Sequence, residues 1–216
     1  MKSKTTKRTT ILNPGRQDLR KIIHISIGMI GFAYPFMQWE TILVIWVIAT
    51  FCAWFLPSRI EPLEKILRQD EIKRGYSSAM IAYGIIMLLG TIIFRSAYIN
   101  SLILLAVLAF GDGFSSLIGM NNRGTAIFYN QKKTVAGTFA FVIFGVIGAL
   151  ALIFFYGVFT ISSPLLLSIG LLPIFRVLII VTVCAIVESI DWKFSDNIPV
   201  GIAAILMILA TSGISH

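Results

Sequence analysis

The chain has few charged residues for its size, and this shortage excludes most classes of soluble protein. Only 13% of its 216 residues are Asp, Glu, Lys or Arg, whereas 57% are hydrophobic. Soluble domains average about 25% charged and about 45–50% apolar residues. The composition therefore predicts a polytopic membrane protein and excludes a soluble enzyme, a disordered tail and a fibrous repeat.

Cysteine and histidine are also scarce. Cys52 and Cys184 lie in apolar runs, where a packing role is expected rather than a disulfide or a metal site. The only histidines are His24 and His216, and the sequence has no HExxH, GxSxG or CxxC motif. Zinc peptidase, serine hydrolase and dithiol redox chemistry are therefore not expected.

Acidic residues are outnumbered, with 10 Asp and Glu against 18 Lys and Arg and a net charge of +8. The basic residues flank apolar runs or lie in short loops, which favours anionic lipid head groups over nucleic acid as a partner. We expect residues 1–21 to form a basic cytoplasmic arm and residues 22–216 to form a single transmembrane catalytic domain.

The apolar runs predict an all-α fold with about seven transmembrane helices, since one crossing needs about 20 apolar residues. The run from 134 to 175 is too long for one helix, and we expect an interfacial or re-entrant segment over 157–173. The predicted spans are Ile22–Trp39, Thr41–Leu56, Gly75–Phe94, Ser96–Gly111, Val135–Tyr156, about Ile174–Ile190, and Ile198–Ile214.

Alternation of these spans places three loops, at 57–75, 112–133 and 189–197, on the side of the basic arm. This is the cytoplasmic side, because lysine and arginine are concentrated there. The loop at 57–75 has helically spaced apolar residues and is expected to lie on the membrane surface as an amphipathic helix. No N-x-S/T sequon is present, and we expect an integral protein of a prokaryotic plasma membrane.

The densest group of polar residues begins at Asp112, where the fourth span is expected to end in a glycine-rich loop. A carboxylate there could hold Mg²⁺ together with substrate phosphates. Lysines supply point charges for phosphates, and the start of the next helix favours an anion. The alternative is a glycine-rich turn with ordinary interfacial lysines. The residues expected to bind a nucleotide here are Gly111, Ser115, Ser116, Gly119, Arg123, Lys132, Lys133, Thr134 and Gly137.

Two further groups lie on the same predicted face. Glu188, Asp196 and Asn197 could supply a second metal ligand or a base for a hydroxyl group, although Asp196 or Asn197 could instead cap the last helix. Arg20 and His24 share a helix face and could hold a phosphate or a lipid head group. Basic membrane anchors and a histidine buried in the bundle are the alternative for this pair.

Taken together, these motifs resemble the phytol kinase and dolichol kinase family of CTP-dependent membrane kinases. The motifs are Asp112 with Ser115, Ser116 and Gly119, then Lys133-Thr134-x-x-Gly137, Glu188-Ser189 and Asp196-Asn197-x-Pro199, preceded by Arg20-Lys21-x-x-His24. The resemblance runs from about residue 20 to about residue 200.

The resemblance implies transfer of the CTP γ-phosphate to a lipid alcohol such as phytol, a polyprenol, dolichol or diacylglycerol. It implies Mg²⁺ on Asp112 and Glu188, with Asp112, Lys133, Glu188 and Asp196 as catalytic residues. Phosphatidate cytidylyltransferases share part of the pattern and are the first alternative, although their C-terminal motifs do not occur after Gly137. A small membrane transporter is the second alternative.

Overall fold

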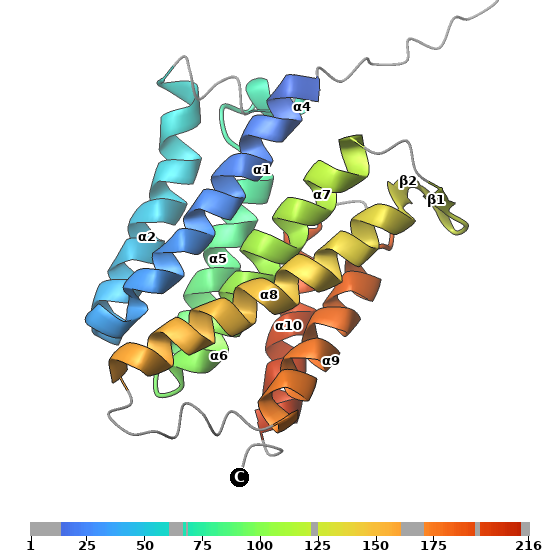
Figure 1. Ribbon diagram of the computed structural model, residues 1–216. Helices are drawn as coiled ribbons and strands as arrows, with labels where there is room; N and C mark the ends of the chain where they lie inside the picture. Colours follow the sequence, from blue (N-terminus) through green and yellow to red (C-terminus); the bar gives the residue numbers. More distant parts are fainter. Residues whose placement is uncertain are drawn as a thin grey trace, which may run out of the picture.

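The protein is a bundle of helices in the computed structural model, with a short hairpin at one end (Figure 1). The structure describes residues 14–60, 67, 69–121, 125–160, 171–192 and 195–212. Most of the basic arm, the centre of the loop at 57–75, Arg123 and the middle of the predicted re-entrant segment lie outside these ranges. The surface helix and the re-entrant segment therefore stay predictions.

The long helices follow the predicted spans closely, because uninterrupted apolar runs fix where they can lie. They are α1 (Pro14–Gly28), α2 (Trp39–Phe55), α5 (Ser78–Ile93), α6 (Tyr98–Ala106), α7 (Asp112–Asn121), α8 (Val135–Thr160), α9 (Leu171–Glu188) and α10 (Asn197–Thr211). The shorter helical segments are η1 (Met29–Phe36), η2 (Leu56–Ser58), α4 (Gln69–Ile72) and η3 (Val107–Gly111).

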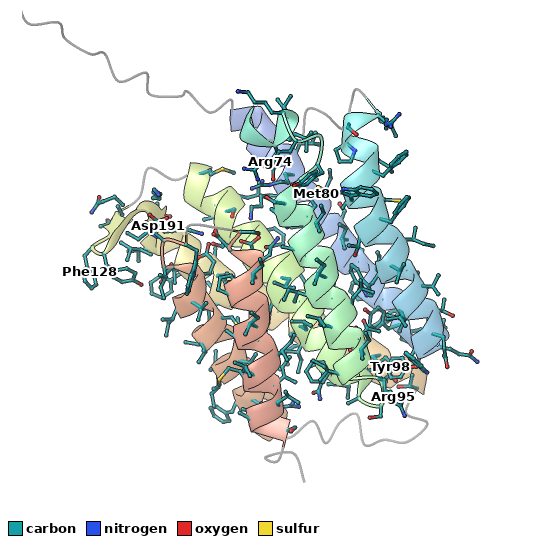
Figure 2. The ribbon with its side chains drawn as sticks, turned by 180° about the vertical axis from the view of Figure 1, so that it is seen from behind. Arg74, Met80, Arg95, Tyr98, Phe128 and Asp191 are labelled. Atoms are coloured by element: carbon teal, nitrogen blue, oxygen red, sulfur yellow. The ribbon has the colours of Figure 1, made fainter. Side chains whose placement is uncertain are left out.

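Three helical segments in the described part of the chain are long and apolar enough to cross a membrane, and this supports a membrane protein. They are Trp39–Ser58, Tyr98–Met120 and Val135–Thr160, and α5 and α10 are shorter apolar helices. Arg95 and Tyr98 lie at the opposite end of the bundle from Arg74 and Asp191 (Figure 2). This arrangement agrees with the predicted alternation of loops, while the number seven and the cytoplasmic side remain predictions.

The helix that contains the start of the first predicted span begins before Ile22. Helix α1 begins at Pro14, so Arg20 and Lys21, at the end of the predicted arm, are helical. The helix then narrows into the 3₁₀ segment η1, which contains Pro35. Proline has no N–H to donate and clashes with the carbonyl four residues before it, so Pro35 disfavours α-helical hydrogen bonding in the second half of this segment.

The expected glycine-rich loop after Gly111 is wrong, because the chain continues there as helix α7. Segments α6, η3 and α7 follow one another without a break, and Asp112 lies well inside the resulting helix. The η3 turn is a π-helical turn in which the N–H of Asp112 donates to the carbonyl of Val107. The small residues after Asp112 let this helix pack closely against its neighbours instead of forming a turn.

The expectation of a purely helical fold is also incomplete. Strands β1 (Ala126–Ile127) and β2 (Asn130–Thr134) pair antiparallel in a short hairpin between α7 and α8. The hairpin projects from the end of the bundle that holds Asp191, and Phe128 lies at its turn (Figure 2). Strands of two to five residues give too little apolar periodicity to be recognised in the sequence.

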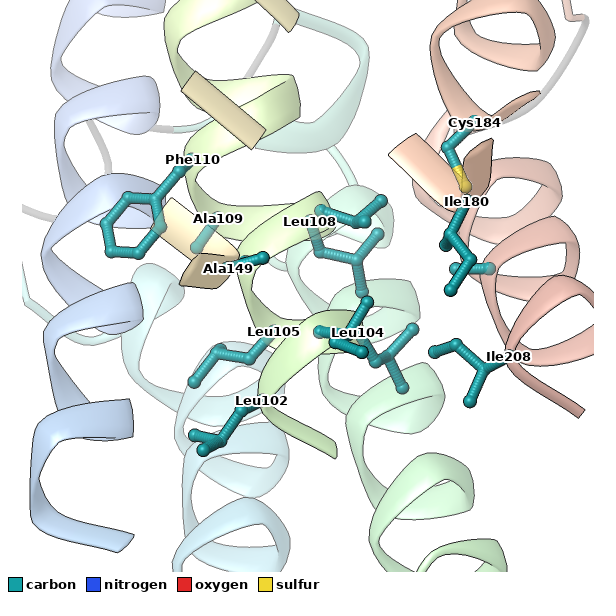
Figure 3. Packing of buried hydrophobic residues seen from close by; sticks show 14 of the residues in the cluster. Leu102, Leu104, Leu105, Leu108, Ala109, Phe110, Ala149, Ile180, Cys184 and Ile208 are labelled. Carbon is teal, nitrogen blue, oxygen red and sulfur yellow. The ribbon is translucent and has the colours of Figure 1, made fainter. Parts of the chain in front are cut away.

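The core is built around the α6–η3 segment, where every side chain from Leu102 to Ala109 is at most 1% exposed. The leucines of this segment lie along the centre of the bundle, and Ile180, Cys184 and Ile208 of α9 and α10 lie beside them (Figure 3). Lateral packing from all sides explains why this segment is uniformly apolar rather than amphipathic.

One glycine in α8 gives a direct test of this packing. A Cβ atom at Gly148 would lie 2.2 Å from Cδ2 and 3.0 Å from Cβ of Phe110. We expect Gly148→Ala to lower the free energy of unfolding by about 1–3 kcal/mol, since overpacking outweighs the better helix propensity of alanine, about 1 kcal/mol. Thermal unfolding in detergent measures this change. Ala151→Leu, at an exposed position on the same helix, is the control, and a Gly148→Ala protein with a higher Tm than wild type would contradict the packing.

Candidate functional site

A cavity of about 380 Å³ opens at the end of the bundle near the hairpin, between α1, α5, α7, β2, α8, α9 and α10. It collects residues from six separate stretches of the sequence, and we call it the polar pocket. The predicted site residues that line it are Arg20, His24, Asp112, Ser115, Ser116, Gly119, Lys132, Lys133, Thr134, Gly137, Glu188, Asp196 and Asn197. Gly111 is not among the lining residues, and Arg123 lies outside the described ranges.

Asp112 is a deeply buried acid of the polar pocket, with 2% of its surface exposed. Its Oδ2 atom accepts a hydrogen bond of 2.6 Å from Nζ of Lys21, and Nδ1 of His24 lies 3.8 Å from the same oxygen. The other oxygen, Oδ1, is buried and has no hydrogen-bond partner among the described residues. Half of a buried carboxylate is therefore left without a protein ligand, which is unusual in a folded protein.

Lys133 joins the two other acids of the polar pocket. Its Nζ atom donates to Oε1 of Glu188 and, at 2.9 Å, to Oδ2 of Asp196. Burial by itself would lower the pKa of Lys133, but the carboxylates of Glu188, Asp196 and Asp112 raise it above its ordinary value. The lysine is therefore a fixed positive charge at neutral pH.

Glu188 ends helix α9 inside the protein, with 1% of its surface exposed. The hydroxyl of Ser115 donates to its Oε1 atom over 3.4 Å, whereas its Oε2 atom has no partner among the described residues. Asp112 and Glu188 both line the polar pocket, and each has one oxygen without a hydrogen-bond partner among the described residues. They fit a Mg²⁺ ion, which needs one or two carboxylates when substrate phosphates and water complete its shell.

No group of three or more His, Cys, Asp or Glu residues in the described part of the chain is placed to hold a metal ion by itself. Those residues therefore do not form a metal site that is complete before the substrate binds. A metal that arrives with a phosphate ligand remains compatible with the two free carboxylate oxygens.

The hairpin is fixed to the end of α9 by several hydrogen bonds. The amide of Asn130 donates to the carbonyl of Ser189 over 2.8 Å, and the hydroxyls of Tyr129 and Ser189 are 2.5 Å apart. Lys132 pairs with Asp191 at 2.7 Å, but both side chains are largely exposed, so this ion pair contributes little stability. These contacts hold β2 in place and direct Lys133 into the polar pocket.

The glycines that the sequence analysis assigned to nucleotide binding lie where helices pack closely together. Gly119 and Gly137 face each other across α7 and α8, where a Cβ atom on Gly137 would lie 3.4 Å from Cα of Gly119. Gly111 packs on the ring of Phe141, where a Cβ atom on Gly111 would lie 2.9 Å from Cε1 of the ring. Ser115 and Thr134 both lie beside this close approach and line the polar pocket.

The start of α10 combines a structural residue with a functional candidate. Asp196 precedes the helix but makes no side-chain capping hydrogen bond, and its carboxylate turns to Lys133 instead. The amide of Asn197 donates to the carbonyl of Ala79 over 2.7 Å and thereby ties α10 to α5. The capping alternative for Asp196 is therefore wrong.

Lys21 belongs to the Arg20-Lys21-x-x-His24 motif, but the sequence analysis gave it no role in the site. Arg20 lines the polar pocket and is 6% exposed, but it is Lys21 that forms the ion pair with Asp112. The available signal was the spacing of Lys21 and His24, three residues apart on one helix, which places both on the same face.

Comparisons with known proteins agree with these motifs. No family model and no solved structure matches the chain. It is 27% identical over 221 residues to phytol kinase 1, chloroplastic, of Arabidopsis thaliana, covering 90% of this chain and 66% of the relative. It is 30% identical over 131 residues to probable phytol kinase 1, chloroplastic, of Glycine max, covering 60% and 42%.

A third relative, probable phytol kinase 3, chloroplastic, of Glycine max, is 26% identical over 206 residues, or 87% of this chain. The chain spans between 42% and 66% of the lengths of these relatives. All three are named as chloroplastic, so they give the predicted prokaryotic plasma membrane no support. Their names and the extent of the match confirm the resemblance that the motifs indicated: the chain is similar in sequence to phytol kinases.

Proposed function

We propose that this chain is a membrane lipid-alcohol kinase, which transfers the γ-phosphoryl group of CTP to the hydroxyl of an isoprenoid alcohol. The observation that carries the proposal is the polar pocket. It joins two buried carboxylates with free oxygens to two partly buried lysines, at one end of a bundle of apolar helices. The similarity to phytol kinases makes phytol the first candidate acceptor. The choice of CTP rests on the resemblance to the CTP-dependent kinase family.

The charges of the polar pocket suit phosphoryl transfer, which depends on positioning and electrostatic stabilisation more than on covalent chemistry. Lys133 and Lys21 are already held by carboxylates, so their ammonium groups are oriented before a nucleotide arrives. They would stabilise the negative charge on the transferred group and on the leaving diphosphate. Asp196, the most exposed of the three acids, would orient the acceptor hydroxyl and accept its proton.

Asp112 and Glu188 would hold Mg²⁺ through their free oxygens. The ion supplies charge neutralisation on the nucleotide phosphates when it is bound. Ser115 and Ser116 at the start of α7 and Thr134 before α8 line the same cavity and can donate hydrogen bonds to phosphate oxygens. The residues present therefore fit a Mg-nucleotide complex.

A double-label experiment tests the reaction type. Purified protein in detergent is given Mg²⁺ and CTP labelled at either the α or the γ phosphate, with phytol, geranylgeraniol, a polyprenol, diacylglycerol or phosphatidate. We expect label from the γ position only, recovered in an isoprenoid alcohol phosphate. Label from the α position in phosphatidate would instead show a cytidylyltransferase, and no label in any lipid would contradict both reactions.

A further inference from the structure

The hairpin turn between β1 and β2 has unusual residues for a turn. Phe128 and Tyr129 form it, between the paired residues Ile127 and Asn130. Two-residue hairpin turns favour glycine, asparagine and aspartate, which adopt the tight backbone easily and are well hydrated. Phe128 is 90% exposed, and its ring meets the ring of Tyr129 edge to face at 4.7 Å between centroids. Neither turn formation nor packing among the described residues accounts for so large an apolar ring at this position.

The base of the hairpin, in contrast, is fixed to the protein. The hydroxyl of Tyr129 lies 2.5 Å from the hydroxyl of Ser189 at the end of α9. Asn130, which is 4% exposed, donates to the carbonyl of Ser189, and its side-chain oxygen accepts the N–H of Lys132. The exposure of Phe128 is therefore a property of a turn that is held in place.

The lipid-facing surface of α8 leads directly to this hairpin. Apolar side chains that are 40–65% exposed recur every four residues along one side of the helix, at Val135, Phe139, Ile143 and Ile147. The first of them, Val135, follows the last residue of β2. With 26 residues, α8 is about 39 Å long, which exceeds the hydrocarbon thickness of about 30 Å. The start of α8 and the hairpin therefore lie where acyl chains meet head groups.

The direction of the hairpin brings its tip back towards the membrane. It projects sideways from the start of α8 (Figure 1). Phe128 lies at the outer side of the bundle, and it is nearer than Asp191 to the end that holds Tyr98 (Figure 2). The exposed ion pair of Asp191 with Lys132 then lies towards water, and the aromatic ring lies towards the acyl chains. This order of side chains is typical of segments that lie at a membrane interface.

We propose that Phe128 inserts into the boundary between head groups and acyl chains, in the leaflet around the polar pocket, and anchors the hairpin there. The partner is the phospholipid layer itself. Continuity with the lipid-facing stripe of α8 favours lipid over a second protein chain as the cover of this ring. Because β2 runs from this turn to Lys133, the anchor would also steady the strand that carries this lysine. The proposal goes beyond the kinase function and can be tested without measuring activity.

The first measurement locates the ring. Trifluoromethyl-phenylalanine is incorporated at position 128, and fluorine NMR relaxation is recorded in phospholipid nanodiscs. The discs contain a lipid with a nitroxide near the head-group end of its acyl chain, or they are surrounded by a water-soluble gadolinium chelate. The same probe at Phe139 is the reference for a lipid-facing site, and the free amino acid gives the aqueous limit. We expect the probe at 128 to respond to the nitroxide lipid and to be shielded from the chelate about threefold or more.

The second measurement tests anchoring, by comparing hydrogen exchange of the β2 amides in nanodiscs. We expect Phe128→Ser to speed this exchange about tenfold, and Phe139→Ser, which removes a ring from α8 only, to leave it unchanged. Serine is the better turn residue, so faster exchange in Phe128→Ser cannot come from the turn itself.

Three results would overturn the proposal. The first is equal β2 exchange in the two serine variants. The second is a probe at 128 that is as open to the chelate as the free amino acid. The third is a probe shielded from both reagents, which would show that a protein surface, such as a second copy of this chain, covers Phe128.

Discussion

Replacing Asp112 by asparagine should lower phosphoryl transfer by about a hundred- to a thousandfold while the helical bundle stays intact. The amide has almost the same shape, so the close packing around this 2%-exposed side chain is preserved. It lacks the negative charge that pairs with Lys21 and that could bind a divalent ion. The loss should therefore appear in catalysis and metal affinity, with a smaller effect on folding.

The measurement is turnover at saturating CTP and phytol, together with stabilisation of the protein by Mg²⁺ and a nucleotide in thermal unfolding. We expect Asp112→Asn to need far more Mg²⁺ for the same shift in Tm. Lys21→Met, which removes only the partner of Asp112, should lower turnover without this change in Mg²⁺ requirement. Near-normal turnover of Asp112→Asn, or an identical Mg²⁺ requirement in both variants, would remove Asp112 from the metal site.

The second large effect is expected at Lys133, whose ammonium group is shared by Glu188 and Asp196. Lys133→Met should abolish measurable turnover and also destabilise the protein by about 3–5 kcal/mol, because it leaves the buried Glu188 carboxylate without its charge partner. These two effects have different causes and can be separated by a second substitution.

The double variant Lys133→Met/Glu188→Gln removes both charges and should recover most of the lost thermal stability. It should nevertheless stay inactive, since the phosphate-binding charge and one metal ligand are both absent. Lys73→Ala, at an exposed lysine outside the polar pocket, is the matched control for the loss of one positive charge. Recovery of turnover together with stability in the double variant would show that Lys133 has only a structural role.

The course of the chain through the bundle could be predicted from the sequence, because the order and length of the apolar runs determine it. The apolar runs beginning at Thr41 and Val135 became α2 and α8 with ends displaced by a few residues. The polar residues that interrupt these runs also gathered at one end of the bundle, as alternation of spans requires. Most of the candidate site followed from this alternation.

What could not be predicted depends on how helices rotate and approach one another. Asp112 was expected at a helix end, because a buried carboxylate inside a helix is costly unless a partner such as Lys21 is supplied from another segment. Phe128 resembles an ordinary aromatic residue in an apolar run, and only the folded arrangement shows that it lies at an exposed turn. The hairpin is too short to leave a recognisable pattern.

The π-helical turn at η3 means that the spacing of residues in this stretch matters as much as their identity. A wide turn holds one more residue than a regular α-helical turn, and each residue of an α-helix advances the direction of the side chain by about 100°. Deleting a single residue between Val107 and Gly111 would swing Asp112 round the helix axis relative to Leu102, away from Lys21. Changes of length in this turn should therefore be tolerated less well by evolution than exchanges among its apolar side chains.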